Sequence, residues 1–231
     1  MEVSHSLSSS SLGYPKQLWI FHSERNLPAN RLLVFLDAEI YLQRVGARDQ
    51  VQPLIDAPGQ DATCVVFVSH GTEGQRMSES LFNRKFSSFL CDELLAFLRA
   101  QKFVAPNAVA SLCGLSLTGL ATVMAAVHYP GVYQKIAAQS GAYWPEEGRV
   151  LRELEALPTG IRQAFYFDVG SEETDREGEV MSQKEGVEAV GQVLEQKGYA
   201  VSQHIFPGGH AIEGWSAALP QYLDWAMKAG A

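Results

Sequence analysis

Gly114-Leu115-Ser116-Leu117-Thr118-Gly119 stands between two apolar segments of different character. Residues 108–113 before it are typical of a buried strand, and residues 117–128 have the pattern of a helix that stops before Pro130. A strand, a sharp turn centred on a serine and then a helix hold the serine hydroxyl clear of a sheet's edge. The turn also directs the first free N–H groups of the helix beside that hydroxyl. Such a site can attack a carbonyl and stabilise the oxyanion that forms.

One residue of this turn departs from the usual pattern, because Thr118 stands where a second glycine is common. Helix and strand press together close to such a nucleophile, which favours glycine. A β-branched residue therefore predicts a slightly opened turn or a different approach of the helix to the strand.

The rest of the chain alternates short apolar runs with longer helical patterns. We expect helices over residues 86–102, 117–128, 177–197 and 212–228, and strands over residues 18–22, 32–36, 64–69, 108–113, 136–140, 164–169 and 200–206. Most of these strands lack polar alternation, as is typical of strands covered on both faces. The fold class is therefore α/β, with a mostly parallel central sheet and helices on both faces.

Bulk properties exclude several classes of protein. The chain has 231 residues and a formal net charge of −8, and an acidic surface disfavours nucleic acid and anionic membranes as partners. Residues 1–12 are serine-rich, without the basic start and apolar core of a secretory signal. We expect residues 1–14 to be a disordered or tag-like lead-in and residues 15–231 to form a single domain.

The cysteines Cys64, Cys91 and Cys113 are odd in number and lie in dissimilar contexts. They predict buried free thiols in a reducing compartment, hence a cytoplasmic location. The sequence has no Cys-x-x-Cys pair, which argues against a structural zinc site. We expect chemistry that needs neither a metal nor an organic cofactor.

A serine in such a turn needs a base to take its proton. Two histidines follow the serine at a large interval, His204 and His210. His204 falls inside an alternating strand pattern, whereas His210 follows Pro207-Gly208-Gly209 on a loop just past the last strand. His210 is therefore the expected base; the alternative is a loop histidine that faces solvent.

The acid that orients the histidine is expected on the loop over residues 170–175, after the strand at residues 164–169. Glu172, Glu173 and Asp175 are all candidates; Glu173 is preferred and Asp175 is the alternative acid. Asp168, at the strand's end, is a weaker candidate. In a further alternative all three loop acids are solvated and the site works as a serine–histidine dyad.

An oxyanion hole needs two donors. The N–H of Leu117 follows from the serine turn, and the N–H of Ala38 is expected from the loop that follows the strand at residues 32–36. In the alternative reading, this loop is only a strand end followed by a helix cap at Asp37.

Four segments now point to a family: residues 33–38, 76–98, 113–144, and the loop Pro207-Gly208-Gly209-His210 followed by Trp215. Together they resemble the putative-esterase family of α/β-hydrolases, in particular its enterobactin (enterochelin) esterase branch. The resemblance spans residues 17–225. It implies the α/β-hydrolase fold and cleavage of carboxylic esters, and the named branch opens trilactone siderophores.

The resemblance also implies roles for individual residues. Ser116 would be the nucleophile, His210 the base, and Arg76 would meet a catecholate or carboxylate of the substrate. Tyr143 and Trp144 would wall the substrate cleft, although packing in the core is an equal alternative for them.

Three functions follow, all on a small-molecule ester or its analogue. The leading one is a serine carboxylester hydrolase that forms an acyl-enzyme on Ser116. The second is an acyltransferase on the same residues, and the third is a non-catalytic binding protein on a hydrolase fold.

Overall fold

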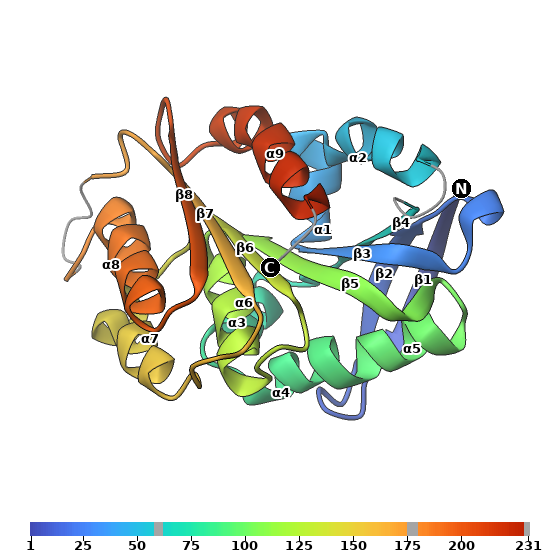
Figure 1. The fold of residues 1–231 in the computed structure, drawn as a ribbon, viewed down its shortest axis with the longest axis horizontal. Coiled ribbons are helices and arrows are strands. Elements are labelled where there is room, and N and C mark those ends of the chain that lie inside the picture. Colours follow the sequence, from blue (N-terminus) through green and yellow to red (C-terminus); the bar gives the residue numbers. More distant parts are fainter. Residues whose placement is uncertain (58–61, 175–179, 229–231) are drawn as a thin grey trace.

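One sheet carries the fold (Figure 1). In this computed structural model, residues 1–57, 62–174 and 180–228 are described, and within them eight strands pair in the order β1-β2-β4-β3-β5-β6-β7-β8. The strands are β1 (Glu2–Ser8), β2 (Pro15–Phe21), β3 (Ala29–Leu36), β4 (Thr63–Val68), β5 (Val104–Leu115), β6 (Lys135–Gln139), β7 (Ala164–Gly170) and β8 (Ala200–Phe206). The seven strands expected from the sequence are all present.

The sheet is parallel from β4 to β8 and antiparallel at the β1–β2 and β2–β4 pairs. The parallel strands β4 and β7 are buried along their whole length, which is why they read as continuous apolar runs. Parallel strands bring their carboxyl ends to one edge of the sheet, so the loops after β3, β5, β6, β7 and β8 gather there. The expected mostly parallel sheet is confirmed, and the fold is that of the α/β-hydrolases.

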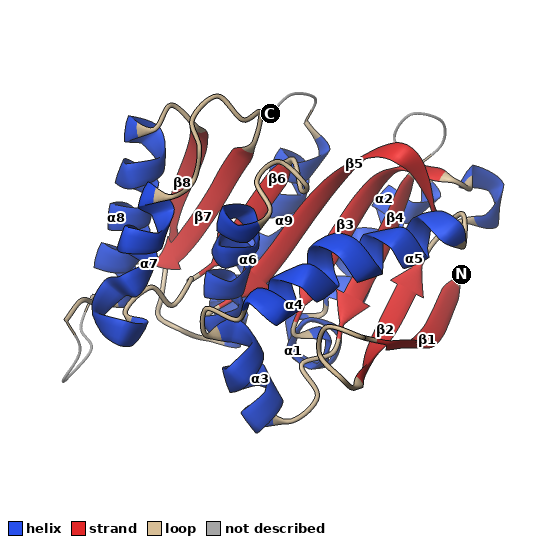
Figure 2. Cartoon of the chain, turned by 90° about the horizontal axis from the view of Figure 1, so that it is seen from below, coloured by secondary structure: helices blue, strands red, loops and turns tan. Residues whose placement is uncertain are grey.

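Helices cover both faces of the sheet, as Figure 2 shows from below. One face carries α1 (Ala38–Ile40), the π-helical turn η2 (Tyr41–Val45), α2 (Ala47–Asp56) and α9 (Ile212–Met227). The other carries α3 (Glu73–Ser80), α4 (Arg84–Ser88), the π-helical segment η4 (Phe89–Leu94), α5 (Leu95–Ala100), α6 (Leu117–His128), α7 (Pro145–Glu155) and α8 (Gln183–Gln196). A short 3₁₀ turn, η1 (Glu24–Asn26), precedes β3.

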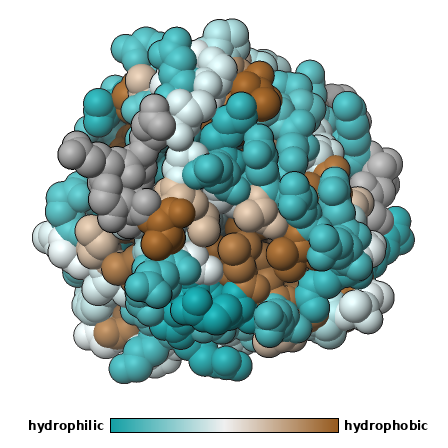
Figure 3. Space-filling view, turned by 90° about the vertical axis from the view of Figure 1, so that its left-hand side faces the viewer, coloured by the Kyte–Doolittle hydropathy of each residue, from teal (hydrophilic) through white to brown (hydrophobic). Residues whose placement is uncertain are grey.

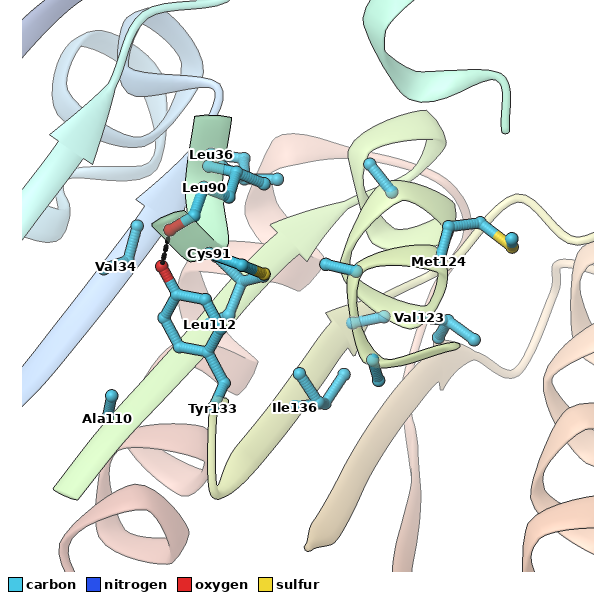
Figure 4. Close-up of a cluster of buried hydrophobic side chains, with 14 of the residues drawn as sticks. Val34, Leu36, Leu90, Cys91, Ala110, Leu112, Val123, Met124, Tyr133 and Ile136 are labelled. Carbon is cyan, nitrogen blue, oxygen red and sulfur yellow. Dashed lines mark hydrogen bonds between the residues drawn. The ribbon is translucent and has the colours of Figure 1, made fainter. Parts of the chain in front are cut away.

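Each face of the sheet has its own apolar core. Figure 4 shows part of the larger one, where side chains of β3, β5 and β6 meet η4 and α6. Its one polar contact in that view is the Tyr133 hydroxyl, which donates to the carbonyl oxygen of Leu90 at 2.8 Å. Burial of so much apolar surface holds the helices against the sheet and fixes the strand ends that carry the site.

The N-terminal segment is ordered, so the expected lead-in over residues 1–14 is wrong. Residues Glu2–Ser8 form the edge strand β1, antiparallel to β2. Every second residue of β1 is exposed and the others are only half-buried, so the serine-rich strand resembles a polar tail in sequence. Glu93 of η4 accepts hydrogen bonds from Ser10 and Ser11, which ties the turn after β1 to the helical layer.

The helices match the sequence more loosely than the strands do. Residues 117–128 form α6 as expected. The helix expected over residues 86–102 corresponds to the continuous helical stretch of α4, η4 and α5, which begins at Arg84 and ends at Ala100. The expected helix over residues 177–197 begins in the structure at Gln183, and residues 175–179 lie outside the described residues. The helix α7 was not expected from the sequence.

Candidate active site

Ser116 lies on a sharp turn at the carboxyl end of β5, directly before α6. Its φ of 51° and ψ of −120° are uncommon for a residue with a side chain. Its N–H donates to the carbonyl oxygen of Gln139 at 2.8 Å, and its own carbonyl oxygen accepts from Ala142 at 2.9 Å. These bonds to the β6 strand and the loop after it hold the strained turn in place.

The close approach of α6 to the sheet depends on the glycines at positions 114 and 119 and does not need a glycine at position 118. A Cβ built on Gly114 would lie 2.4 Å from the carbonyl oxygen of Thr118, and one built on Gly119 would lie 3.0 Å from the Ala138 side chain. The helix therefore presses on β5 and β6 as in a standard elbow, and the expectation that Thr118 opens the turn is wrong. Thr118 is buried and its side chain meets Asp37 instead.

The structure brings Ser116, His210 and Glu173 together in one hydrogen-bonded line. His210 Nε2 lies 2.9 Å from Ser116 Oγ, and His210 Nδ1 lies 2.7 Å from Glu173 Oε2. His210 is on the loop between β8 and α9, and Glu173 is on the loop after β7, so both loops leave the same edge of the sheet. The geometry fits a serine hydroxyl that donates to an imidazole whose other N–H donates to a carboxylate.

Glu173 is held from its other side by groups that the sequence did not assign. Its Oε1 accepts from Ser140 Oγ at 2.6 Å and from the N–H of Gly170 at 2.7 Å. Ser140 Oγ in turn accepts from Trp215 Nε1 at 3.0 Å. Both Ser140 and Trp215 stand in segments that carry the family resemblance, but a serine next to a strand end gives no local sign of such a partner.

The other acidic candidates are placed differently. Glu172 is exposed, and Asp175 lies outside the described residues. Asp168 is fully buried, and its Oδ2 accepts from Gln139 Nε2 at 3.2 Å rather than from His210. Burial raises the pKa of Asp168 from 3.8 to about 7. His204 is on β8, where its Nδ1 is 2.8 Å from the side-chain amide of Gln221.

The two candidate oxyanion donors are the first residues of their helices. Leu117 begins α6 and Ala38 begins α1, so neither N–H has an acceptor one turn earlier in its own helix. Asp37, before Ala38, has the left-handed φ of 59° and makes no side-chain cap to the helix. Its carboxylate instead binds Arg76 and Thr118, so the alternative of a simple helix cap at Asp37 does not describe this turn.

A cavity of about 520 Å³ opens beside Ser116. Arg76 lies in its wall, but Arg76 Nε and Nη2 are bonded to the two carboxylate oxygens of Asp37 at 2.9 and 2.8 Å. Burial lowers the pKa of Arg76, and the hydrogen bonds and charge of Asp37 outweigh this and raise it. The cavity is lined by Arg76, Met77, Leu81, Ser116, Leu117, Ala142, Trp144, Pro145, Glu146 and His210.

Of the two aromatic residues expected in the cleft wall, one is there. Trp144 lines the cavity. Tyr143 is fully buried, and its ring packs edge-on against Phe167 of β7 with the ring centroids 6.1 Å apart. The expectation of a cleft role for Tyr143 is wrong, because its side chain is packed in the core and does not line the cavity. Seen from the side of α7 and α8, the surface is mostly hydrophilic with apolar residues gathered near its centre (Figure 3).

Within residues 1–57, 62–174 and 180–228, no group of three or more His, Cys, Asp or Glu side chains is placed to hold a metal ion. In the same part of the chain no helix has the length and apolar character that a membrane span requires. Cys64, Cys91 and Cys113 are all buried and unpaired with one another.

Solved structures share this fold at low sequence identity. An enterochelin esterase from Shigella flexneri superposes with a TM-score of 0.81 and 21% identity, over 98% of this chain and 58% of that chain. A ferulic acid esterase gives a TM-score of 0.74 and 16% identity, over 98% of this chain and 97% of its own. This chain thus spans little more than half the length of the Shigella protein.

The sequence comparisons are consistent with that fold. The uncharacterised protein YbbA of Bacillus subtilis is 30% identical over 93 residues, which are 40% of this chain and 37% of that protein. The pattern described as "Putative esterase" matches residues 12–226, nearly the whole chain. The chain therefore belongs to the putative esterase family of α/β-hydrolases.

Proposed function

We propose that this protein is a serine hydrolase of carboxylic esters that works through an acyl-enzyme on Ser116. The observation that carries the proposal is the unbroken line of hydrogen bonds from Ser116 through His210 to Glu173, with contacts of 2.9 and 2.7 Å. A serine so connected is activated by its base, and the base is held in the correct tautomer by the carboxylate.

The steps follow from this arrangement. Ser116 Oγ adds to the ester carbonyl carbon while its proton passes to His210 Nε2, and Glu173 stabilises the imidazolium that forms. The carbonyl electron pair moves to oxygen, where the N–H groups of Leu117 and Ala38 receive the oxyanion. Collapse of this intermediate expels the alcohol, which takes the proton from His210. Water then attacks the acyl-Ser116 by the same route, with His210 as its base, and releases the acid.

The cavity favours an ester with an apolar group next to the scissile bond. Met77, Leu81 and Trp144 supply apolar walls. The two charged residues in the lining are already paired, Arg76 with Asp37 at 2.8 Å and Glu146 with Arg149 at 3.0 Å. An uncharged acyl group therefore loses less hydration there than an anionic one does. Enterobactin, in the presence of which an enterobactin esterase of the same fold from Shigella flexneri was crystallised, is a narrower candidate in which Arg76 would also contact the substrate.

A chromogenic assay tests the proposal. We expect wild type to hydrolyse short-chain p-nitrophenyl esters and Ser116→Ala to lose activity on the order of 10⁶-fold in kcat. His210→Ala is expected to fall similarly, whereas His204→Ala, a matched control on β8, keeps wild-type activity. Equal turnover by wild type and Ser116→Ala would contradict the proposal. Enterobactin as a second substrate tests the narrower candidate.

Two alternative functions, acyl transfer and non-catalytic binding, can be tested on the same purified protein. In acyl transfer, an added alcohol or amine takes the acyl group from Ser116, so product analysis with and without an acceptor distinguishes it from hydrolysis. A folded protein that turns over no ester and takes up no fluorophosphonate would be a non-catalytic binding protein. We also propose a reducing compartment such as the cytoplasm, because the cysteines are buried and unpaired.

A further inference from the structure

The hydroxyl of Thr118 joins two parts of the site that lie far apart in sequence. Thr118 Oγ1 accepts from the N–H of Leu115 at 3.0 Å, one residue before Ser116. The same oxygen donates to Asp37 Oδ2 at 2.8 Å, across 81 positions of sequence. A carbonyl oxygen, that of Leu115, is also within 2.9 Å, but a carboxylate is the stronger acceptor. One hydroxyl therefore links the serine turn to the turn after β3.

The partner, Asp37, is itself fixed. Its residue is 1% exposed, and Arg76 binds both of its oxygens. A bidentate arginine–carboxylate pair defines the orientation of the carboxylate as well as its position. Asp37 is joined by a peptide bond to Ala38, and Thr118 is joined by one to Leu117. The Thr118–Asp37 hydrogen bond thus connects the residues that adjoin the two candidate oxyanion donors.

We propose that Thr118 is a positioning residue for the oxyanion hole: its hydroxyl sets the N–H of Leu117 relative to the N–H of Ala38. This inference rests on the proposed esterase function. It gives Thr118 a role that glycine cannot fill, since glycine has no side chain to reach Asp37. The chain keeps glycine at positions 114 and 119, where α6 meets the sheet, and uses the intervening position for this contact.

The physical reason for an effect on rate is the precision that the transition state requires. Donors stabilise an oxyanion only when they lie within hydrogen-bond range of where that oxygen forms. A displacement of about 1 Å in a catalytic arrangement can cost about 10²-fold in rate. Removal of the Thr118 hydroxyl would free the turn after β3 from the start of α6, while ground-state contacts with the ester in the cavity stay in place.

The test compares three variants on a p-nitrophenyl ester. Thr118→Val keeps the shape and removes the hydroxyl, and Thr118→Ser keeps a hydroxyl. Thr122→Val is the matched control: Thr122 lies one turn later on α6 and is fully buried. Within the described part of the chain its hydroxyl bonds to the carbonyl oxygens of Gly119 and Ala137, at 2.8 and 3.1 Å. A trifluoromethyl ketone, which forms a tetrahedral oxyanion adduct on a serine, reports transition-state binding separately.

We expect Thr118→Val to lower kcat about 10- to 100-fold and to change KM less than about twofold. The affinity for the trifluoromethyl ketone should fall by about the same factor as kcat. Thr118→Ser should recover most of kcat, and Thr122→Val should keep it. Should Thr118→Val not fold, Thr118→Ala removes the same hydroxyl without steric demand.

Unchanged kcat in folded Thr118→Val or Thr118→Ala would overturn the inference while the esterase proposal stands. An equal fall in Thr122→Val would also overturn it, because the effect would then be one of helix stability. A wild type that neither turns over the ester nor binds the ketone would instead overturn the proposed function, and the inference with it.

Discussion

Two buried carboxylates flank Ser116, and they differ in what they face. Asp37 follows β3 and Glu173 follows β7, with residue exposures of 1% and 6%. Asp37 binds the guanidinium of Arg76, which is charged at every pH the protein meets. Glu173 binds the imidazole of His210, which is charged only when it holds a second proton.

This difference separates a fixed support from a working part. A permanent ion pair holds its geometry whatever happens at the serine, so Asp37 suits a structural anchor for the turn at Ala38. Among the described residues, the donors to the Glu173 carboxylate besides His210 are neutral, namely Ser140 Oγ and the N–H of Gly170. It therefore gains most when the imidazole becomes a cation, which is the moment after Ser116 gives up its proton. Partner chemistry, rather than burial, distinguishes the two roles.

Among substitutions of the carboxylates and their supports, Glu173→Gln should lower kcat the most. Glutamine keeps the size of the side chain, but it cannot stabilise the imidazolium and it permits the wrong tautomer of His210. We expect kcat to fall about 10⁴-fold with little change in thermal stability. Glu172→Gln, the exposed neighbour, is the matched control and should match wild type. If Glu173→Gln is active and Asp175→Asn is not, the acid was assigned to the wrong residue.

Asp37→Asn should mainly lower the stability of the protein. The substitution leaves Arg76 largely buried without its counter-charge, and breaking such a pair costs about 3 kcal/mol of unfolding free energy. Chemical denaturation would measure this loss, with Asp56→Asn, an exposed aspartate at the end of α2, as a control expected within about 0.5 kcal/mol of wild type. An unchanged unfolding free energy in Asp37→Asn would mean that the Asp37–Arg76 ion pair does not stabilise the turn at Ala38.

Asp168 provides a third buried carboxylate, and no cation contacts it within the described residues. Burial raises its pKa from 3.8 to about 7, so the folded state keeps the proton that the unfolded state releases. Between about pH 4 and pH 7 this group therefore lowers the unfolding free energy as pH rises, by at most about 1.4 kcal/mol per pH unit. Asp168→Asn should remove that slope and be the more stable protein at pH 8. The measurement is the unfolding free energy of both proteins by chemical denaturation at several pH values. The same dependence on pH in wild type and Asp168→Asn would refute the assignment.

Trp215→Phe should give the smallest effect. It removes the donor to Ser140 Oγ, at 3.0 Å, and so loosens the support of Glu173 without touching its bond to His210. The ring still packs edge-on against His210, where the centroids are 4.9 Å apart. We expect kcat to fall about threefold, in line with the loss of one neutral hydrogen bond. Trp225→Phe on the same helix is the control, and an equal fall there would remove the special role of Trp215.

The sheet was readable from the sequence because its central strands are buried on both faces. Runs such as Cys64-Val65-Val66-Phe67-Val68 have no polar interruption, so each predicts its strand directly. The edge strand β1 was missed for the opposite reason, since its residues are exposed or half-buried and carry no apolar run. Pairing with β2 holds the strand, and Glu93 of η4 holds the turn after it through Ser10 and Ser11. Short helices such as α3, which depends on a capping box between Thr72 and Gln75, carry too little apolar periodicity to stand out.

The site divides in the same way. Ser116 and His210 could be predicted from the local sequence of their turns, and Glu173 from its position after a strand. The partner of Thr118 is 81 positions away, and the support of Glu173 comes from Ser140, on the loop after β6, and from Trp215 of α9. Local sequence holds no record of such contacts, because they exist only once the strand ends are brought to one edge. Tyr143 and Trp144 show the limit most plainly, because of these adjacent aromatic residues one is fully buried and the other, half-buried, lines the cavity.

The central claim, an activated nucleophile at Ser116, is tested most directly by reaction with a fluorophosphonate followed by peptide mapping. The account predicts one adduct per chain, on the peptide that contains Ser116, with none in Ser116→Ala and much slower labelling in Glu173→Gln. A folded wild-type protein that stays unlabelled, or is labelled at another residue, would contradict it.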